Sequence, residues 1–232
     1  MKTTRKIALL LVTIMLLTTV LCSCGGGGMK GAVENPYKLY ATKNVSYDKY
    51  IEASTNGYLA SEMKGVLKIL SKTDDYEDIY DEFEEDWENQ YEDLVDEYGK
   101  NLKVTLKLEE KEEIKSKDLK SYQEELRSTG EYFKDIVEDY EDLDEDYVKD
   151  LAEDLGITKS DLDKIIDYFN DIGTALYKCE VTEGYELDYT VTIKGDDDED
   201  EFYSTFVVIK VDGYWINPKF FTTIVEDVLT LF

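Results

Sequence analysis

The sequence predicts an α+β fold in which N-terminal helices pack on an antiparallel sheet, with a helical insertion after the first strand. Apolar residues recur at helical spacing up to residue 98, alternate from residue 102, return to helical spacing over 118–172, and alternate again from residue 185. Strands gathered late in the chain, apart from the helices, are typical of α+β domains and not of repeating βαβ units.

The first 23 residues have the pattern of a secretory signal peptide. Three basic residues precede an almost wholly apolar run from Ile7 to Leu21, which is too short to span a bilayer comfortably. The run ends in Leu21-Cys22-Ser23-Cys24, which resembles the bacterial lipobox. The resemblance implies cleavage before Cys24, lipidation of Cys24, and an anchored lipoprotein on the extracytoplasmic face of the cell membrane. The alternatives are an ordinary signal peptide and a single-span anchor.

Residues 24–43 are expected to form a flexible tether that begins at the lipidated Cys24. Four glycines follow that cysteine directly, and a polar stretch continues to Pro36. Cys22 would be discarded with the signal peptide. The expected organisation is therefore a signal peptide at 1–23, a lipidated tether at 24–43 and one folded domain at 44–232.

Helical spacing predicts the first elements of the folded domain. Ser46 is placed to cap a first helix, and a second apolar stripe runs over 59–70. A long helix is expected to begin at Asp74 or Asp75 and to stop at Gly99, with its many acids on the solvated face.

Alternation predicts the strands. Four leucine and valine residues at positions 102, 104, 106 and 108 share one face of a half-buried strand. After the helical insertion, a second strand runs over 185–193 and a third over 202–211. Asp212-Gly213 is a type I′ hairpin signal that precedes a short return strand, and a final helix is expected over 220–232.

The segment YELDYTVTIKGDDDEDEFYSTFVVIKVDGYWIN, residues 185–217, resembles the strand pair of NTF2-like, or cystatin-like, domains found in Gram-positive surface lipoproteins. The resemblance spans residues 44–217 and implies that the sheet is curved and wraps around the N-terminal helices. The helical insertion at 118–172 is longer than that family needs.

Composition excludes several classes of function. Residues 24–232 carry 23 basic and 54 acidic side chains, a formal charge of −31, which disfavours nucleic acid and anionic surfaces as partners. The chain has no histidine, so catalysis by Ser/His or Cys/His pairs and zinc sites with histidine ligands are absent. After Cys24 the sole cysteine is Cys179, for which we expect a buried core position.

Residues 151–166, LAEDLGITKSDLDKII, resemble a helix-turn-helix. A DNA-reading helix presents cations and amides, whereas the second helix here exposes Asp161, Asp163 and Asp167. The interpretation we prefer is two packed helices, with Thr158 and Asp161 as a capping pair and no nucleic-acid partner.

The acidic run 195–201, GDDDEDE, raises the question of a metal site. Asp196, Asp198 and Asp200 are weak candidate ligands, because a calcium loop needs an internal glycine and spaced ligands that this run lacks. We expect a solvated connection between two strands and no metal or other cofactor.

These features favour a non-catalytic binding or scaffolding module. Its expected partners are membrane lipid, through Cys24, and an envelope protein or a small ligand. The alternative is a small-molecule hydrolase or isomerase that uses Asp and Tyr in the cone of an NTF2-like fold. Asp188 and Tyr189 are adjacent on one strand, but alternation places Asp188 on the face opposite the apolar side chains.

Overall fold

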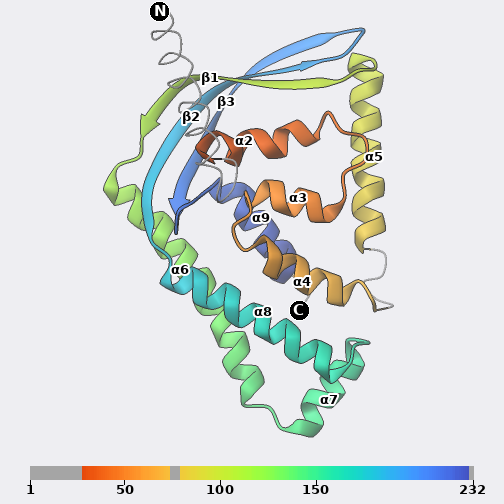
Figure 1. The fold of residues 1–232 in the computed structure, drawn as a ribbon, viewed down its shortest axis with the longest axis vertical. Coiled ribbons are helices and arrows are strands. Elements are labelled where there is room, and N and C mark those ends of the chain that lie inside the picture. Colours follow the sequence, from red (N-terminus) through yellow and green to blue (C-terminus); the bar gives the residue numbers. More distant parts are fainter. Residues whose placement is uncertain (1–27, 74–78, 230–232) are drawn as a thin grey trace, which may run out of the picture.

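A computed structural model describes residues 28–73 and 79–229 of the chain. The described residues form eight helices and four strands, and the fold class is α+β as predicted (Figure 1). In chain order the elements are α2 (Gly28–Leu39), α3 (Tyr47–Ser54), α4 (Ala60–Leu70), α5 (Ile79–Tyr98), β1 (Lys103–Glu113), α6 (Ser116–Glu141), α7 (Glu145–Asp154), α8 (Lys159–Lys178), β2 (Val181–Lys194), β3 (Glu199–Val211), β4 (Tyr214–Ile216) and α9 (Pro218–Leu229).

The four strands form one antiparallel sheet in the order β1-β2-β3-β4. The sheet bends around α2, with α3 and α9 beyond it (Figure 1). Strands β1 and β2 pair from Lys103 opposite Lys194 to Glu113 opposite Tyr185, with a bulge between Leu108 and Glu110. The three helices between β1 and β2 leave the sheet as a long helical excursion, so the predicted helical segment after the first strand is present.

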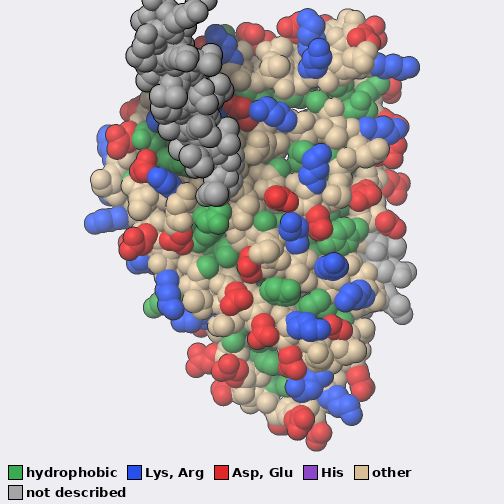
Figure 2. Space-filling model, in the orientation of Figure 1, with side chains coloured by type: hydrophobic (Ala, Val, Ile, Leu, Met, Phe, Trp, Pro, Cys, Tyr) green, Lys and Arg blue, Asp and Glu red, His purple; other side chains and the backbone are tan. Residues whose placement is uncertain are grey.

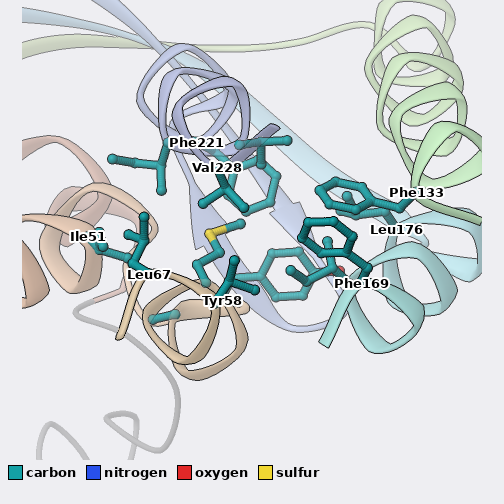
Figure 3. Packing of buried hydrophobic residues seen from close by; sticks show 14 of the residues in the cluster. Ile51, Tyr58, Leu67, Phe133, Phe169, Leu176, Phe221 and Val228 are labelled. Carbon is teal, nitrogen blue, oxygen red and sulfur yellow. The ribbon is translucent and has the colours of Figure 1, made fainter. Parts of the chain in front are cut away.

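Each face of the sheet contributes to a different part of the core. Leu187, Tyr189 and Val191 of β2 pack with Ala32 and Val33 of α2 on one face. On the other face, Ile209 and Val211 of β3 belong to the largest cluster, which joins the sheet to α3, α4, α6, α8 and α9. Figure 3 shows this cluster, where Phe133 and Phe169 meet edge to face with ring centroids 5.2 Å apart.

The expected tether is wrong from residue 28 onward, because Gly28–Leu39 form helix α2 and pack against the sheet. Its buried residues recur at helical spacing: Ala32, Val33, Pro36 and Leu39. Burial of this face stabilises the helix despite Pro36, which removes one backbone hydrogen bond. The domain boundary expected at residue 44 therefore lies too late in the chain, while residues 24–27 fall outside the described part.

Several local predictions are confirmed. Ser46 caps α3 by accepting a hydrogen bond from the Lys49 amide, and Thr158 caps α8 by accepting one from the Asp161 amide. The β3–β4 turn has positive φ at both central residues, +51° at Asp212 and +91° at Gly213, as a type I′ turn requires. The predicted helix start at Asp74 or Asp75 lies outside the described residues.

Two glycines determine how closely the long helices of the excursion approach. A Cβ at Gly130 of α6 would lie 2.4 Å from the Tyr177 backbone nitrogen of α8, and one at Gly173 would lie 3.0 Å from the Phe133 Cβ. The backbones can cross this closely because neither residue has a side chain. From this crossing, α6 and α8 extend toward α7 (Figure 1).

Candidate functional site

The predicted lipidation site, Cys24, and the whole signal peptide at 1–23 lie outside the described residues. Over residues 28–73 and 79–229, no helix is both long enough and apolar enough to cross a membrane. The anchor therefore remains a prediction from the lipobox.

The acidic run is not a free loop, because its backbone is docked on the end of α5. Only Gly195–Asp198 connect β2 to β3. The Asp197 and Asp198 amides donate to the Tyr98 carbonyl at 2.9 and 3.1 Å, and the Asp196 amide donates to the Lys100 carbonyl at 2.9 Å. The last carbonyls of a helix have no intrahelical donors, so this loop supplies them.

The three weak metal candidates each accept a hydrogen bond from a different donor. Asp196 accepts from the Asn101 side chain at 2.8 Å, and Asp198 accepts from the Glu199 amide at 2.8 Å. Asp200 accepts from the Tyr98 hydroxyl at 3.0 Å. Within the part of the chain that the structure describes, no group of three or more acidic or cysteine side chains could hold a metal ion.

Asp188 and Tyr189 face opposite sides of the sheet, as alternation predicts. Asp188 accepts a hydrogen bond from Thr205 of β3, and near it Glu109 accepts one from Thr190 at 2.8 Å. Tyr189 is only 1% exposed and lies on the other face, against α2. The carboxylate and the phenol therefore lie on opposite faces of the sheet.

The Tyr189 hydroxyl is buried and has no hydrogen-bond partner among the described residues. Burial, with a smaller contribution from the Glu34 charge, raises the pKa of Tyr189 to about 12. Glu34 itself is paired with Lys38, with a nitrogen–oxygen distance of 2.7 Å. At neutral pH this site holds an un-ionised phenol among apolar side chains, which provides neither a base nor a nucleophile.

Tyrosine–aspartate pairs are a feature that the sequence analysis did not find. In the described part of the chain, five tyrosine hydroxyls donate to aspartates from distant segments or neighbouring helices. Burial and the adjacent carboxylate raise the pKa of each of these tyrosines. The pairs and their oxygen–oxygen distances are Tyr47–Asp227 (3.4 Å), Tyr58–Asp212 (3.0 Å), Tyr80–Asp48 (3.1 Å), Tyr98–Asp200 (3.0 Å) and Tyr140–Asp163 (2.6 Å).

These pairs explain how so acidic a chain orders its carboxylates with few cations. A phenol donates one hydrogen bond to a carboxylate without adding a positive charge. The half-buried position of Asp227 on α9 raises its pKa, even though the hydrogen bond from the Tyr47 hydroxyl opposes this shift. Asp163, in contrast, has a lowered pKa, chiefly because Tyr140 donates to it.

A groove of about 300 Å³ opens between the far ends of α6, α7 and α8. Its lining is mainly apolar, and it is half open to solvent. Leu162 and Ile166 of α8 form buried parts of the lining, while Tyr132 of α6 is 55% exposed at the edge. The remaining lining residues are Ile136, Asp139, Tyr140, Leu143, Leu151, Leu155 and Leu229.

The groove exists because α7 has two apolar stripes and only one is fully buried. Val148 and Ala152 face Leu162 in a small core cluster, whereas Leu151 and Leu155 are only half-buried beside it. The hydrogen bond between Tyr140 and Asp163 ties α6 to α8 at the same level. The spacing of Leu151 and Leu155 is the sequence signal for a second apolar stripe at α7, although it does not show which stripe is covered.

The groove lies in an acidic part of the chain. Between Glu131 and Lys164 the sequence has fourteen acids and four lysines. Figure 2 shows acidic side chains, with some basic ones among them, at the lower tip of the molecule, where α7 lies. A half-open apolar groove with an acidic surround can hold apolar groups of a ligand, with cationic groups at its edges.

Comparison of this chain with protein-family models, with curated proteins and with solved structures found no match. Function is therefore inferred from the residues and geometry of this chain.

Proposed function

We propose that this chain is a lipid-anchored lipoprotein on the extracytoplasmic face of the cell membrane, whose NTF2-like domain is a non-catalytic binding module. The observation that carries the binding role is the groove between α6, α7 and α8. Half-exposed leucine and isoleucine side chains there are not covered by any element among the described residues, on a surface that is otherwise strongly charged. Exposed apolar patches of this kind mark interaction sites.

The anchor rests on the signal peptide and the lipobox at 21–24. Two or more acyl chains on Cys24 would hold the domain stably at the membrane, whereas one chain would bind only marginally. The NTF2-like assignment is supported by the antiparallel sheet that bends around an N-terminal helix and by the hairpin at 212–213.

Labelling of cells with a fatty-acid analogue tests the anchor. Cys24→Ala should lose the label and leave the protein as precursor or released from the membrane, while the matched variant Cys22→Ala should be labelled normally. Label that persists in Cys24→Ala and disappears in Cys22→Ala would show that the lipobox is assigned to the wrong cysteine.

Site-specific photo-crosslinking in intact cells tests the binding module. A crosslinking amino acid at Tyr132, at the groove edge, should give a discrete adduct with another macromolecule. The control position is Tyr203 of β3, which is 79% exposed and far from the groove in sequence. Identical adduct patterns from the two positions, or no adduct from Tyr132, would refute a binding role for the groove.

A further inference from the structure

We infer that the groove between α6, α7 and α8 binds the apolar face of a cationic amphipathic helix from another envelope protein. The inference rests on the proposed function as a binding module and adds the chemistry of the partner.

The shape of the groove favours a helix over a compact ligand. Small-molecule pockets enclose most of the ligand surface and have volumes of about 300–1,000 Å³. This groove is at the lower end of that range and stays half open, with walls from α6, α7 and α8 and one side chain, Leu229, from α9. An amphipathic helix needs only such an open channel, because it inserts a few apolar side chains and leaves its polar face in solvent.

The charge around the groove favours cations on the partner. Fourteen acids and four lysines over residues 131–164 give this excursion a net charge of about −10 by the ordinary ionisation of these groups. Asp139 lines the groove and is exposed. Lysines that flank an apolar stripe would meet these carboxylates, and such complementarity speeds encounter and selects among partners.

Exposed aromatic rings add a second source of attraction for cations. Tyr132 at the groove edge and Tyr147 on α7 are 55% and 57% exposed. An ammonium group is attracted to the face of an aromatic ring. One such contact occurs between α6 and α8, where the Lys134 ammonium lies 4.3 Å from the Tyr177 ring centroid.

The same charges disfavour other occupants. A second copy of this chain would bring a formal charge of −31 toward an equally acidic surface, so the two would repel. Anionic lipid and nucleic acid are disfavoured for the same reason. A cationic amphipathic segment is the partner that satisfies both the apolar lining and the acidic surround.

The test measures binding of a synthetic helix of leucine and lysine to the folded domain by fluorescence anisotropy. Its leucines lie on one face. Two control peptides are a scrambled sequence of the same composition and a leucine–glutamate analogue. We expect the Leu/Lys helix to bind, with an affinity that falls as salt rises, and the controls to bind at least about tenfold more weakly, since each lost anchor or charge costs roughly 1 kcal/mol.

Surface variants with matched controls localise the site. Tyr132→Ala should weaken binding about tenfold, as loss of an aromatic anchor does, and Tyr203→Ala should not change it. Asp139→Lys should weaken binding about fivefold, whereas Glu84→Lys, an equal charge reversal at an exposed position on α5, should have little effect. All four positions are exposed, and unchanged circular dichroism and melting temperature would establish that the variants fold.

Several outcomes would overturn the inference. Equal binding of the ordered and scrambled peptides, or equal effects of Asp139→Lys and Glu84→Lys, would mean non-specific attraction to an acidic surface. If the Leu/Lys helix binds only to a chain truncated after Leu229, residues 230–232 are the occupant of the groove in the full chain. If the domain self-associates and Tyr132→Ala abolishes this association, a second copy of the chain is the occupant of the groove. Photo-crosslinked adducts from Tyr132 combined with no peptide binding would leave the binding module intact and refute only this class of partner.

Discussion

Gly130→Ala should destabilise the protein, although alanine is the better helix former. Moving the 2.4 Å contact between the new Cβ and the Tyr177 backbone nitrogen to an ordinary 3.4 Å requires α6 and α8 to separate by about 1 Å. Overpacking of this kind costs about 1–3 kcal/mol, and the gain in helix propensity offsets about 1 kcal/mol. The expected net loss is up to about 2 kcal/mol, which corresponds to a fall in Tm of up to about 8 °C for a chain of this size.

Thermal melting followed by circular dichroism measures this effect, with Ser128→Ala as the control. Ser128 is an exposed neighbour on the same helix, so its replacement changes helix propensity without changing the contact between α6 and α8. A Tm of Gly130→Ala that rises as much as helix propensity alone predicts, on the scale set by Ser128→Ala, would refute the close crossing. Separation of the helices should also alter the groove, so Gly130→Ala should weaken binding of the Leu/Lys helix.

Three further variants test other parts of the structure. Gly213→Val should lower the urea midpoint, because strain at positive φ costs about 1–3 kcal/mol of folding free energy, and Gly213→Asn should lower it less. Equal urea midpoints for Gly213→Val and the parent would contradict the type I′ assignment of this turn. Asp227→Asn should raise Tm at pH 7 but not at pH 3. Because the folded-state pKa of Asp227 is raised, its carboxyl group contributes stability below its unfolded pKa, and this stability is lost as pH rises through the folded pKa. Asparagine stays neutral at both pH values, so it avoids the loss at pH 7. A lower Tm at pH 7 would contradict the burial argument. Tyr189→Phe should stabilise the protein by about 1 kcal/mol, since it removes a buried hydroxyl without a partner, and should lessen the loss of stability between pH 10 and 12; a destabilised variant would mean that the hydroxyl has a partner.

The sequence predicts the regular elements well, because each has a clear period or a local signal. The type I′ turn at 212–213 and the Thr158 cap depend only on residues within a few positions, and both are confirmed. The helix at 28–39 was missed because its glycines and Pro36 suggest a loop, while the burial that stabilises it comes from strands some 150 residues later.

Three features of the candidate sites depend on contacts between distant segments, which the sequence does not show. The acidic loop docks through backbone amides onto the Tyr98 carbonyl, and amides carry no sequence signature. The groove depends on which of the two apolar stripes of α7 is covered, and only the packing of α6 against α8 decides this. The five tyrosine–aspartate pairs likewise join segments whose proximity only the fold creates.

The early start of α2 at Gly28 restricts how the domain can move if Cys24 carries the proposed lipid. Four residue steps separate Cys24 from Gly28, so an extended backbone spans at most about 14 Å. The sheet end of the domain would therefore stay near the bilayer. The groove lies at the far end of α8, whose twenty residues span about 30 Å, several times the Debye length of ~8 Å at physiological salt. The groove therefore lies further from the sheet end of the domain than the electrostatic effect of lipid headgroups extends through physiological salt.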